Sequence, residues 1–174
     1  MVAAKTRLAW IVCTAAIAAA SPSKLRSQTL PGGSFPPLAA AGLSGGEVPE
    51  TAGKVVLVDF WASWCAPCKA SFPAYSRIQA AYAERGLVVV AVGVDDNPSA
   101  YAAFVAKLRP AFTTLHDSQH KLVGLVQVPT MPTSYLLDRS GRVRFTHPGF
   151  HGDQTEREIR REIEALLNER PVTQ

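Results

Sequence analysis

Two long apolar runs, separated by a segment with helical spacing, constrain the fold of this chain more than any other feature. The first, KVVLVDFW, covers residues 54–61, and the second, LVVVAVGV, covers residues 87–94. Continuous apolar sequence of this kind is typical of strands that are covered on both faces of a sheet. Between them, residues 66–85 place apolar side chains at helical intervals and stop at Gly86. The sequence therefore predicts a buried strand, a helix and a second buried strand.

The rest of the chain continues this alternation of helices and strands. Further helices are expected at residues 98–108, at 119–126 and from Asp153 onwards. Further strands are expected at residues 112–115, 134–137 and 142–146, the last two joined as a hairpin by the turn sequence DRSG. Asp153 and Glu156 have the spacing of a capping box at the start of the last helix. The order of elements predicts an α/β fold with a central mixed β-sheet and helices on both faces.

The N-terminus has the pattern of an export signal. Lys5 and Arg7 precede an uncharged run at residues 8–20, which ends in an Ala-x-Ala cleavage site. The run is shorter than the roughly 20 residues that span a bilayer comfortably. We therefore predict a signal peptide at residues 1–20, with an uncleaved membrane anchor as the alternative. Cleavage would also remove Cys13.

A linker and a single domain are expected after the signal. Residues 21–37 are rich in Ser, Pro and Gly, which favours a flexible linker, and residues 38–174 are long enough for one domain with its own core. Without the signal, 16 basic and 14 acidic residues remain, so the formal net charge is only +2. This small charge gives no support for binding to nucleic acid.

The motif WCAPCK contains the two remaining cysteines, Cys65 and Cys68, where the first strand leads into a helix. Covalent haem attachment requires a histidine directly after the second cysteine, and this chain has Lys69 there. A structural zinc site requires two further ligands. Two closely spaced histidines, His116 and His120, are expected to be exposed to solvent. A structural disulfide would close a very short loop and stabilise little, so a redox-active pair is the favoured interpretation.

The position of the pair predicts how it would react. At the start of a helix, Cys65 faces unpaired backbone N–H groups and the positive end of the helix dipole, which favour its thiolate. The thiolate is the attacking species in disulfide exchange. Cys68 follows about one turn later, close enough to resolve a mixed disulfide, so we expect Cys65 to be the exposed thiol and Cys68 the shielded one. The two thiols suffice for this chemistry, so no cofactor is expected.

The segment VVLVDFWASWCAPCKASFP resembles the active-site segment of thioredoxin, including a proline, Pro73, five residues after the second cysteine. A distant segment, VPTMPTSYLLD, resembles the cis-proline loop of that family. The export signal, the linker and the hairpin PTSYLLDRSGRV are similar to the TlpA/ResA branch, also described as DsbE- or CcmG-like. The resemblance covers residues 38–170 and implies a thioredoxin-like fold.

The resemblance also implies roles for individual residues. Cys65 corresponds to the nucleophile and Cys68 to the resolving thiol. Asp59 matches a buried acid behind the pair, and burial should raise the pKa of this carboxyl so that it can accept the proton of Cys68.

Three further residues are assigned to substrate binding by the resemblance. Met131 and Pro132 imply a groove in which the backbone around a cis peptide bond pairs with an extended peptide. Trp64 would supply an apolar wall, with packing in the core as its alternative role.

The sequence thus predicts an exported, monomeric thiol–disulfide oxidoreductase of the periplasm. The resemblance implies that it reduces disulfides in specific partner proteins, such as apocytochrome c or a copper-site protein, and that a membrane electron donor recharges it. Two alternatives stay open: a protein dithiol oxidase, and a copper chaperone that uses Cys65 and Cys68 as soft ligands.

Overall fold

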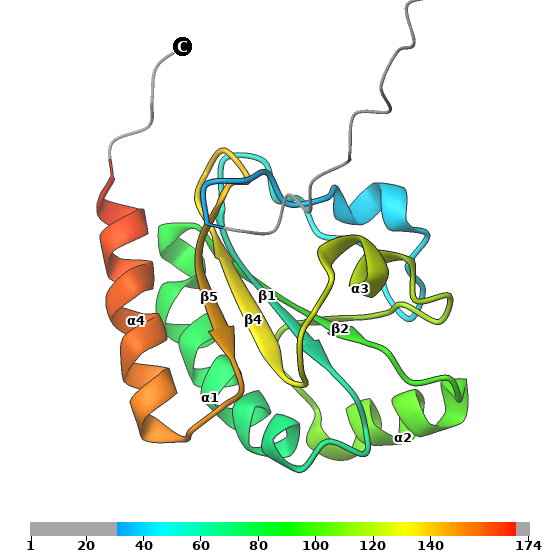
Figure 1. Cartoon of the computed structure of the whole chain (residues 1–174). Coiled ribbons are helices and arrows are strands. Elements are labelled where there is room, and N and C mark those ends of the chain that lie inside the picture. The colour runs from blue at the N-terminus through cyan, green and yellow to red at the C-terminus, as the bar shows by residue number, and fades with distance from the viewer. Residues whose placement is uncertain (1–30, 170–174) are drawn as a thin grey trace, which may run out of the picture.

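The two apolar runs become the central strands of a five-stranded sheet (Figure 1). The computed structural model of the protein describes residues 31–169. β1 (Val55–Trp61) pairs in parallel with β2 (Leu87–Gly93), and nearly every side chain of these two strands is buried. The other three strands are β3 (Thr113–His116), β4 (Thr133–Leu137) and β5 (Val143–Pro148).

The strand order is β3-β2-β1-β4-β5. β3 is parallel to β2, whereas β4 is antiparallel to β1 and to β5. The mixed sheet predicted from the order of elements is therefore confirmed. The hairpin of β4 and β5 accounts for the antiparallel half, because a short turn can join only antiparallel neighbours.

Helices cover both faces of this sheet. In chain order they are η1 (Leu38–Ala41), α1 (Ala66–Tyr82), η2 (Ala83–Arg85), α2 (Pro98–Leu108), α3 (Lys121–Val126) and α4 (Asp153–Asn168). Figure 1 shows α1 and α4 side by side on one face, and α3 with η1 on the opposite face. Alternate residues of β1 face opposite sides: Leu57 packs with α1 and α4, whereas Val58 and Phe60 pack on the α3 side. By the same alternation, Asp59 lies beneath α1 and α4.

Aromatic side chains of β1, α1 and α2 form a third apolar group, which includes both cysteines of the motif. The Trp61 ring stacks on Phe104, with ring centroids 4.4 Å apart, and on Tyr101 at 5.4 Å. A Cβ atom on Gly93 would lie 2.7 Å from the Tyr101 ring and 2.9 Å from Trp61. This close approach requires glycine at the end of β2, and it keeps the aromatic group packed beside the cysteines.

Part of the predicted linker belongs to the folded domain. Gly32 donates a backbone hydrogen bond to Val143 O (2.7 Å), and Phe35 donates one to Gly141 O (3.0 Å). The Phe35 ring is buried against Phe60 and Tyr135. Residues 31–37 are therefore packed on the domain, because burial of one aromatic ring and backbone pairing outweigh their Pro- and Gly-rich composition.

The predicted signal peptide at residues 1–20, with Cys13, lies outside the described residues, as do residues 21–30 of the predicted linker. Within residues 31–169, none of the helices combines the length and the apolar character needed to cross a bilayer.

The predicted capping box at the start of α4 is wrong. The N-cap residue is Gly152, with no capping side chain, and Asp153 is already inside the helix. The Glu156 carboxylate instead accepts hydrogen bonds from Arg77 of α1 and from Arg160, whose Nη2 lies 2.8 Å away. These two cations offer stronger, charge-assisted bonds than the backbone N–H that a capping box would use.

Candidate active site

Cys65 and Cys68 form a disulfide at the junction of β1 and α1, with Cα atoms 5.3 Å apart. Cys65 is the N-cap residue of α1 and has extended backbone geometry, as its place before the helix requires. The Cys68 N–H donates to Cys65 Sγ at 3.2 Å. In this oxidised state Cys65 is 3% exposed and Cys68 is fully buried. Cys65 is thus the cysteine with an exposed surface, although that surface is far smaller than the sequence analysis expected.

Trp64, directly before Cys65, is 72% exposed. This exposure excludes the alternative in which the indole packs in the core. A groove of about 520 Å³ lies between Trp64 and α3 and is lined also by Val94, Asp96 and His120. The Trp64 indole thus offers an exposed apolar surface beside this groove.

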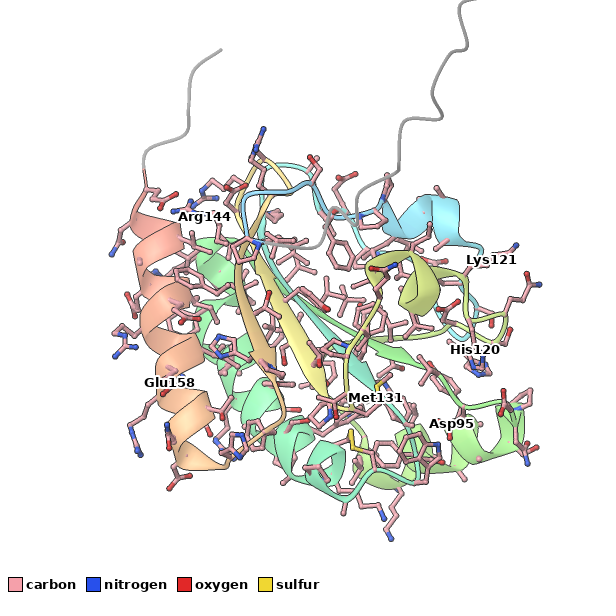
Figure 2. All side chains as sticks on the ribbon, viewed as in Figure 1. Asp95, His120, Lys121, Met131, Arg144 and Glu158 are labelled. Carbon is pink, nitrogen blue, oxygen red and sulfur yellow. A yellow bond between two sulfur atoms is a disulfide. The ribbon has the colours of Figure 1, made fainter. Side chains whose placement is uncertain are left out.

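The Met131–Pro132 peptide bond is cis, as the resemblance implied. Met131 packs against the apolar group that contains both cysteines, and Figure 2 shows it at the end of the sheet where β1 leads into α1. Pro132 is buried, and its carbonyl oxygen accepts the Gly149 N–H at 2.7 Å. The loop that contains the cis-proline and the Cys65–Cys68 disulfide are therefore parts of one packed region.

Asp59 lies in the middle of the protein, with no exposed surface. Its Oδ1 accepts a hydrogen bond from Ser134 Oγ at 2.8 Å, across the pairing of β1 with β4. Ser134 has only one hydroxyl proton, so the Tyr75 hydroxyl donates to Ser134 Oγ at 2.6 Å. Asp59 Oδ2 has no hydrogen-bond partner among the described residues. The carboxyl group is thus buried and only partly satisfied.

Burial raises the pKa of Asp59 from 3.8 to about 8, while the hydroxyls of Ser134 and Tyr75 oppose the rise. Burial and the neighbouring Asp59 charge also raise the pKa of Tyr75 well above its usual value, so Tyr75 stays protonated. The predicted burial and raised pKa of Asp59 are both present in the structure. A carboxyl group with this pKa can take up and release a proton near neutral pH.

His116 and His120, the two histidines considered as metal ligands, have different surroundings. His120 is 45% exposed at its side chain, as expected. The prediction of an exposed His116 is wrong, because its ring is buried and stacks on Tyr101 with centroids 4.5 Å apart. His116 Nε2 lies 2.7 Å from Asp95 O. Within the described part of the chain, no three His, Cys, Asp or Glu side chains gather in a metal-binding arrangement.

Sequence reasoning missed Tyr75 and Ser134, which form a hydrogen-bonded chain to Asp59 of β1, and Asp95, which binds Ser63 in the loop before the motif. Tyr75 occupies a buried face of α1, which the helical spacing could have indicated. Ser134 lies two residues after Pro132, on a strand whose register decides what it faces. Asp95 lies two residues after the end of β2 and could have been noted as a polar residue near the carboxyl end of a buried strand.

Comparisons with known proteins agree with this geometry. The family model for Redoxin matches residues 28–163. The thiol–disulfide oxidoreductase ResA of Bacillus anthracis is 32% identical over 97 residues, which cover 56% of each chain. The chain thus spans little more than half the length of the curated relatives it matches.

Solved structures show the same fold. A Chlorobium tepidum protein described as thiol:disulfide interchange protein DsbE has a TM-score of 0.66 and 39% identity, covering 68% of this chain and 83% of its own. StoA from Bacillus subtilis has a TM-score of 0.56 and 25% identity, covering 63% and 82%. The predicted thioredoxin-like fold is therefore confirmed. The chain belongs to the Redoxin family, and within the thioredoxin superfamily it is ResA/DsbE-like.

Proposed function

We propose that this Redoxin-family chain is a thiol–disulfide oxidoreductase of the cell envelope that reduces disulfides in partner proteins. The observation that carries the proposal is the disulfide of Cys65 and Cys68 at the start of α1, packed with Met131 beside a cis-proline. The names of ResA and of the Chlorobium tepidum DsbE describe thiol–disulfide chemistry and support the same activity for this chain.

The reaction begins with the reduced protein. The Cys65 thiolate attacks one sulfur of a substrate disulfide, so a Cys65–substrate bond forms and the second substrate sulfur leaves as a thiolate. Cys68 then gives its thiol proton to the Asp59 carboxylate and attacks Cys65 Sγ. The first substrate sulfur leaves as a thiolate and takes up a proton. The products are a dithiol substrate and the Cys65–Cys68 disulfide seen in the structure.

Substrate binding is assigned to Trp64, Met131 and Pro132. An extended peptide would pair with the backbone at the cis bond, and the exposed indole would cover its apolar side chains. We further propose export to the periplasm by residues 1–20, cleaved or kept as an anchor, a monomeric protein, and a membrane electron donor. Apocytochrome c cysteines or a copper-site protein are the proposed substrates.

The reaction is tested by single-cysteine variants in a single-turnover assay with a disulfide-containing peptide. Reduced wild-type protein should convert the peptide to its dithiol. Cys68→Ala should stop at a mixed disulfide through Cys65, visible as added mass, because no thiol remains to resolve it. Cys65→Ala should form no adduct. An adduct on Cys68 in wild-type protein would reverse the assigned roles.

The direction of electron flow is tested by equilibrating the protein with a glutathione series. A potential more negative than that of the glutathione couple supports the reductase, whereas a strongly oxidising potential favours the dithiol oxidase. Copper(I) titration of the reduced protein tests the chaperone alternative, since tight stoichiometric binding would favour it. The mass of the protein recovered from cells, with its membrane or soluble fraction, tests cleavage after residue 20.

A further inference from the structure

The loop from β1 to α1 carries Trp64 and Cys65. Ala62 and Cys65 are buried in the aromatic group described above, whereas Trp64 points into solvent. Within the loop, the Cys65 N–H donates to Ala62 O at 3.1 Å. Polar contacts from outside the loop add to this packing next to Cys65, at the start of α1.

Asp95 supplies these contacts from the loop after β2. Both of its carboxylate oxygens accept the Ser63 N–H, at 3.1 and 3.0 Å, and Oδ1 also accepts the Ser63 hydroxyl at 2.5 Å. Asp95 is only 3% exposed. A carboxylate that binds one backbone N–H with both oxygens fixes that N–H in direction as well as in distance.

Asp95 is itself held firmly. Next to it, the Val94 N–H donates to Trp61 O at 3.0 Å, which joins the ends of β1 and β2. The Asp95 carbonyl oxygen lies 2.7 Å from Nε2 of the buried His116, whose ring stacks on Tyr101. Figure 2 shows Asp95 at the same end of the sheet as Met131. The contact to Ser63 thus links the Cys65 loop to the two neighbouring strands.

The charge of Asp95 has no cationic partner: among residues 31–169, no salt bridge includes it. A buried charge paired only with neutral donors costs free energy that a neutral side chain would avoid. The arrangement is therefore costly as a purely stabilising contact. What the carboxylate provides is a fixed position for the backbone two residues before the nucleophile.

We infer that Asp95 is a positioning residue, which through Ser63 holds Cys65 Sγ against the N–H groups at the start of α1. This inference rests on the proposed function for the role of Cys65. Those N–H groups stabilise the Cys65 thiolate, so a displaced loop should raise the pKa of this thiol and slow its attack.

The test is the pH dependence of alkylation of Cys65 in the reduced protein, followed by mass spectrometry of the peptide that contains it. In Asp95→Asn, an NH₂ group replaces one of the two acceptors that face Ser63. Ser63→Ala removes only the hydroxyl bond and keeps the charge. At pH 6 we expect alkylation to slow about tenfold in the first variant and about threefold in the second.

The direction of the change in the alkylation rate of Cys65 distinguishes a positioning role of Asp95 from a purely electrostatic one. If Asp95 acted only by its charge, its removal would favour the thiolate, so Asp95→Asn would alkylate faster and Ser63→Ala would be unchanged. Either of these results, or unchanged profiles in both variants, overturns the inference. If Asp95→Asn does not fold, Ser63→Ala still decides the question.

Asp117 offers a matched control. Its buried carboxylate accepts the backbone N–H groups of Lys121 (3.0 Å) and Val123 (2.8 Å) at the start of α3. Asp117→Asn should leave the alkylation profile of Cys65 unchanged, and an equal change in both aspartate variants would show a general loss of stability instead. The reagent is a small molecule, so the result stands apart from whether the protein reduces partner disulfides.

Discussion

Asp59 of β1 and Asp95 of the loop after β2 both carry buried carboxyl groups, but the hydrogen-bond donors around the two groups differ. Beneath α1 and α4, Asp59 receives one hydrogen bond, from Ser134, and its second oxygen has no partner among the described residues. In the loops beyond β2, both oxygens of Asp95 are bound by Ser63. The number of donors, rather than burial, distinguishes the two sites.

This difference has a chemical consequence. A buried carboxylate with few donors binds a proton easily, and the pKa of Asp59 is accordingly raised to about 8 by burial. A carboxylate whose oxygens are both bonded holds its donors in place instead. The region beneath the helices is therefore suited to proton transfer, and the loop region to positioning.

The largest effect concerns the pH dependence of stability caused by Asp59. Folded Asp59 keeps its proton up to about pH 8, whereas the unfolded chain releases it near pH 3.8. Between these values the folded state binds one more proton, so rising pH favours unfolding by up to about 1.4 kcal/mol per pH unit. This contribution is complete below about pH 4 and is lost as the pH rises through about 8. Asp59→Asn should remove it.

The measurement is denaturant unfolding of the oxidised wild type and of Asp59→Asn from pH 5 to 8. The difference in unfolding free energy should change steadily in favour of the variant as the pH rises. A difference that stays constant with pH would mean that the folded protein holds Asp59 ionised.

Ser134→Ala tests how much the hydrogen bond from Ser134 to Asp59 contributes to stability. The substitution removes the hydrogen bond to Oδ1 and should lower the free energy of unfolding at pH 7 by about 2 kcal/mol, as expected for an unsatisfied buried polar group. Ser140→Ala is the matched control, because Ser140 Oγ donates to Asp138 Oδ1 at 2.6 Å on the exposed surface. It should cost less than about 0.5 kcal/mol. Equal losses would contradict a special environment at Asp59.

Asp59→Asn should slow resolution of the mixed disulfide about tenfold at pH 8 and above, where the Asp59 carboxyl is ionised, since the amide cannot accept the Cys68 proton. Alkylation of Cys65 should change much less, because its attack requires no proton transfer to Asp59. Single-turnover kinetics of both proteins from pH 6 to 9 measure the step. Identical resolution rates throughout would leave Asp59 a structural residue.

The smallest effect is expected at Asp117. Like Asp95, it has a carboxylate with hydrogen bonds to both oxygens, here from two backbone N–H groups. Asp117→Ala should lower the free energy of unfolding by about 1 kcal/mol, the usual cost of losing a helix cap, and leave turnover unchanged. Urea unfolding and the peptide reduction assay measure the two quantities. A large loss of turnover would show that α3 takes part in the reaction.

Much of the fold was predictable because it depends on local patterns. The apolar runs predicted β1 and β2 nearly to the residue, and the helix expected at residues 98–108 has the bounds of α2. The errors occurred where a local pattern competed with a distant partner. Phe35 was assigned to a linker by its Pro- and Gly-rich neighbours, yet it is buried against Phe60 and Tyr135.

The order of the elements, the place of Cys65 and Cys68 at the start of a helix, and the burial of Asp59 within an apolar strand could be inferred from the sequence alone. These features follow from spacing over a few residues, where backbone geometry alone decides which side chains meet. Which donors reach which carboxylate is a property of the folded chain. Ser134 is 75 residues from Asp59, and Asp95 is 32 residues from Ser63. Such contacts depend on the register and order of strands across the whole sheet, which no short stretch of sequence contains.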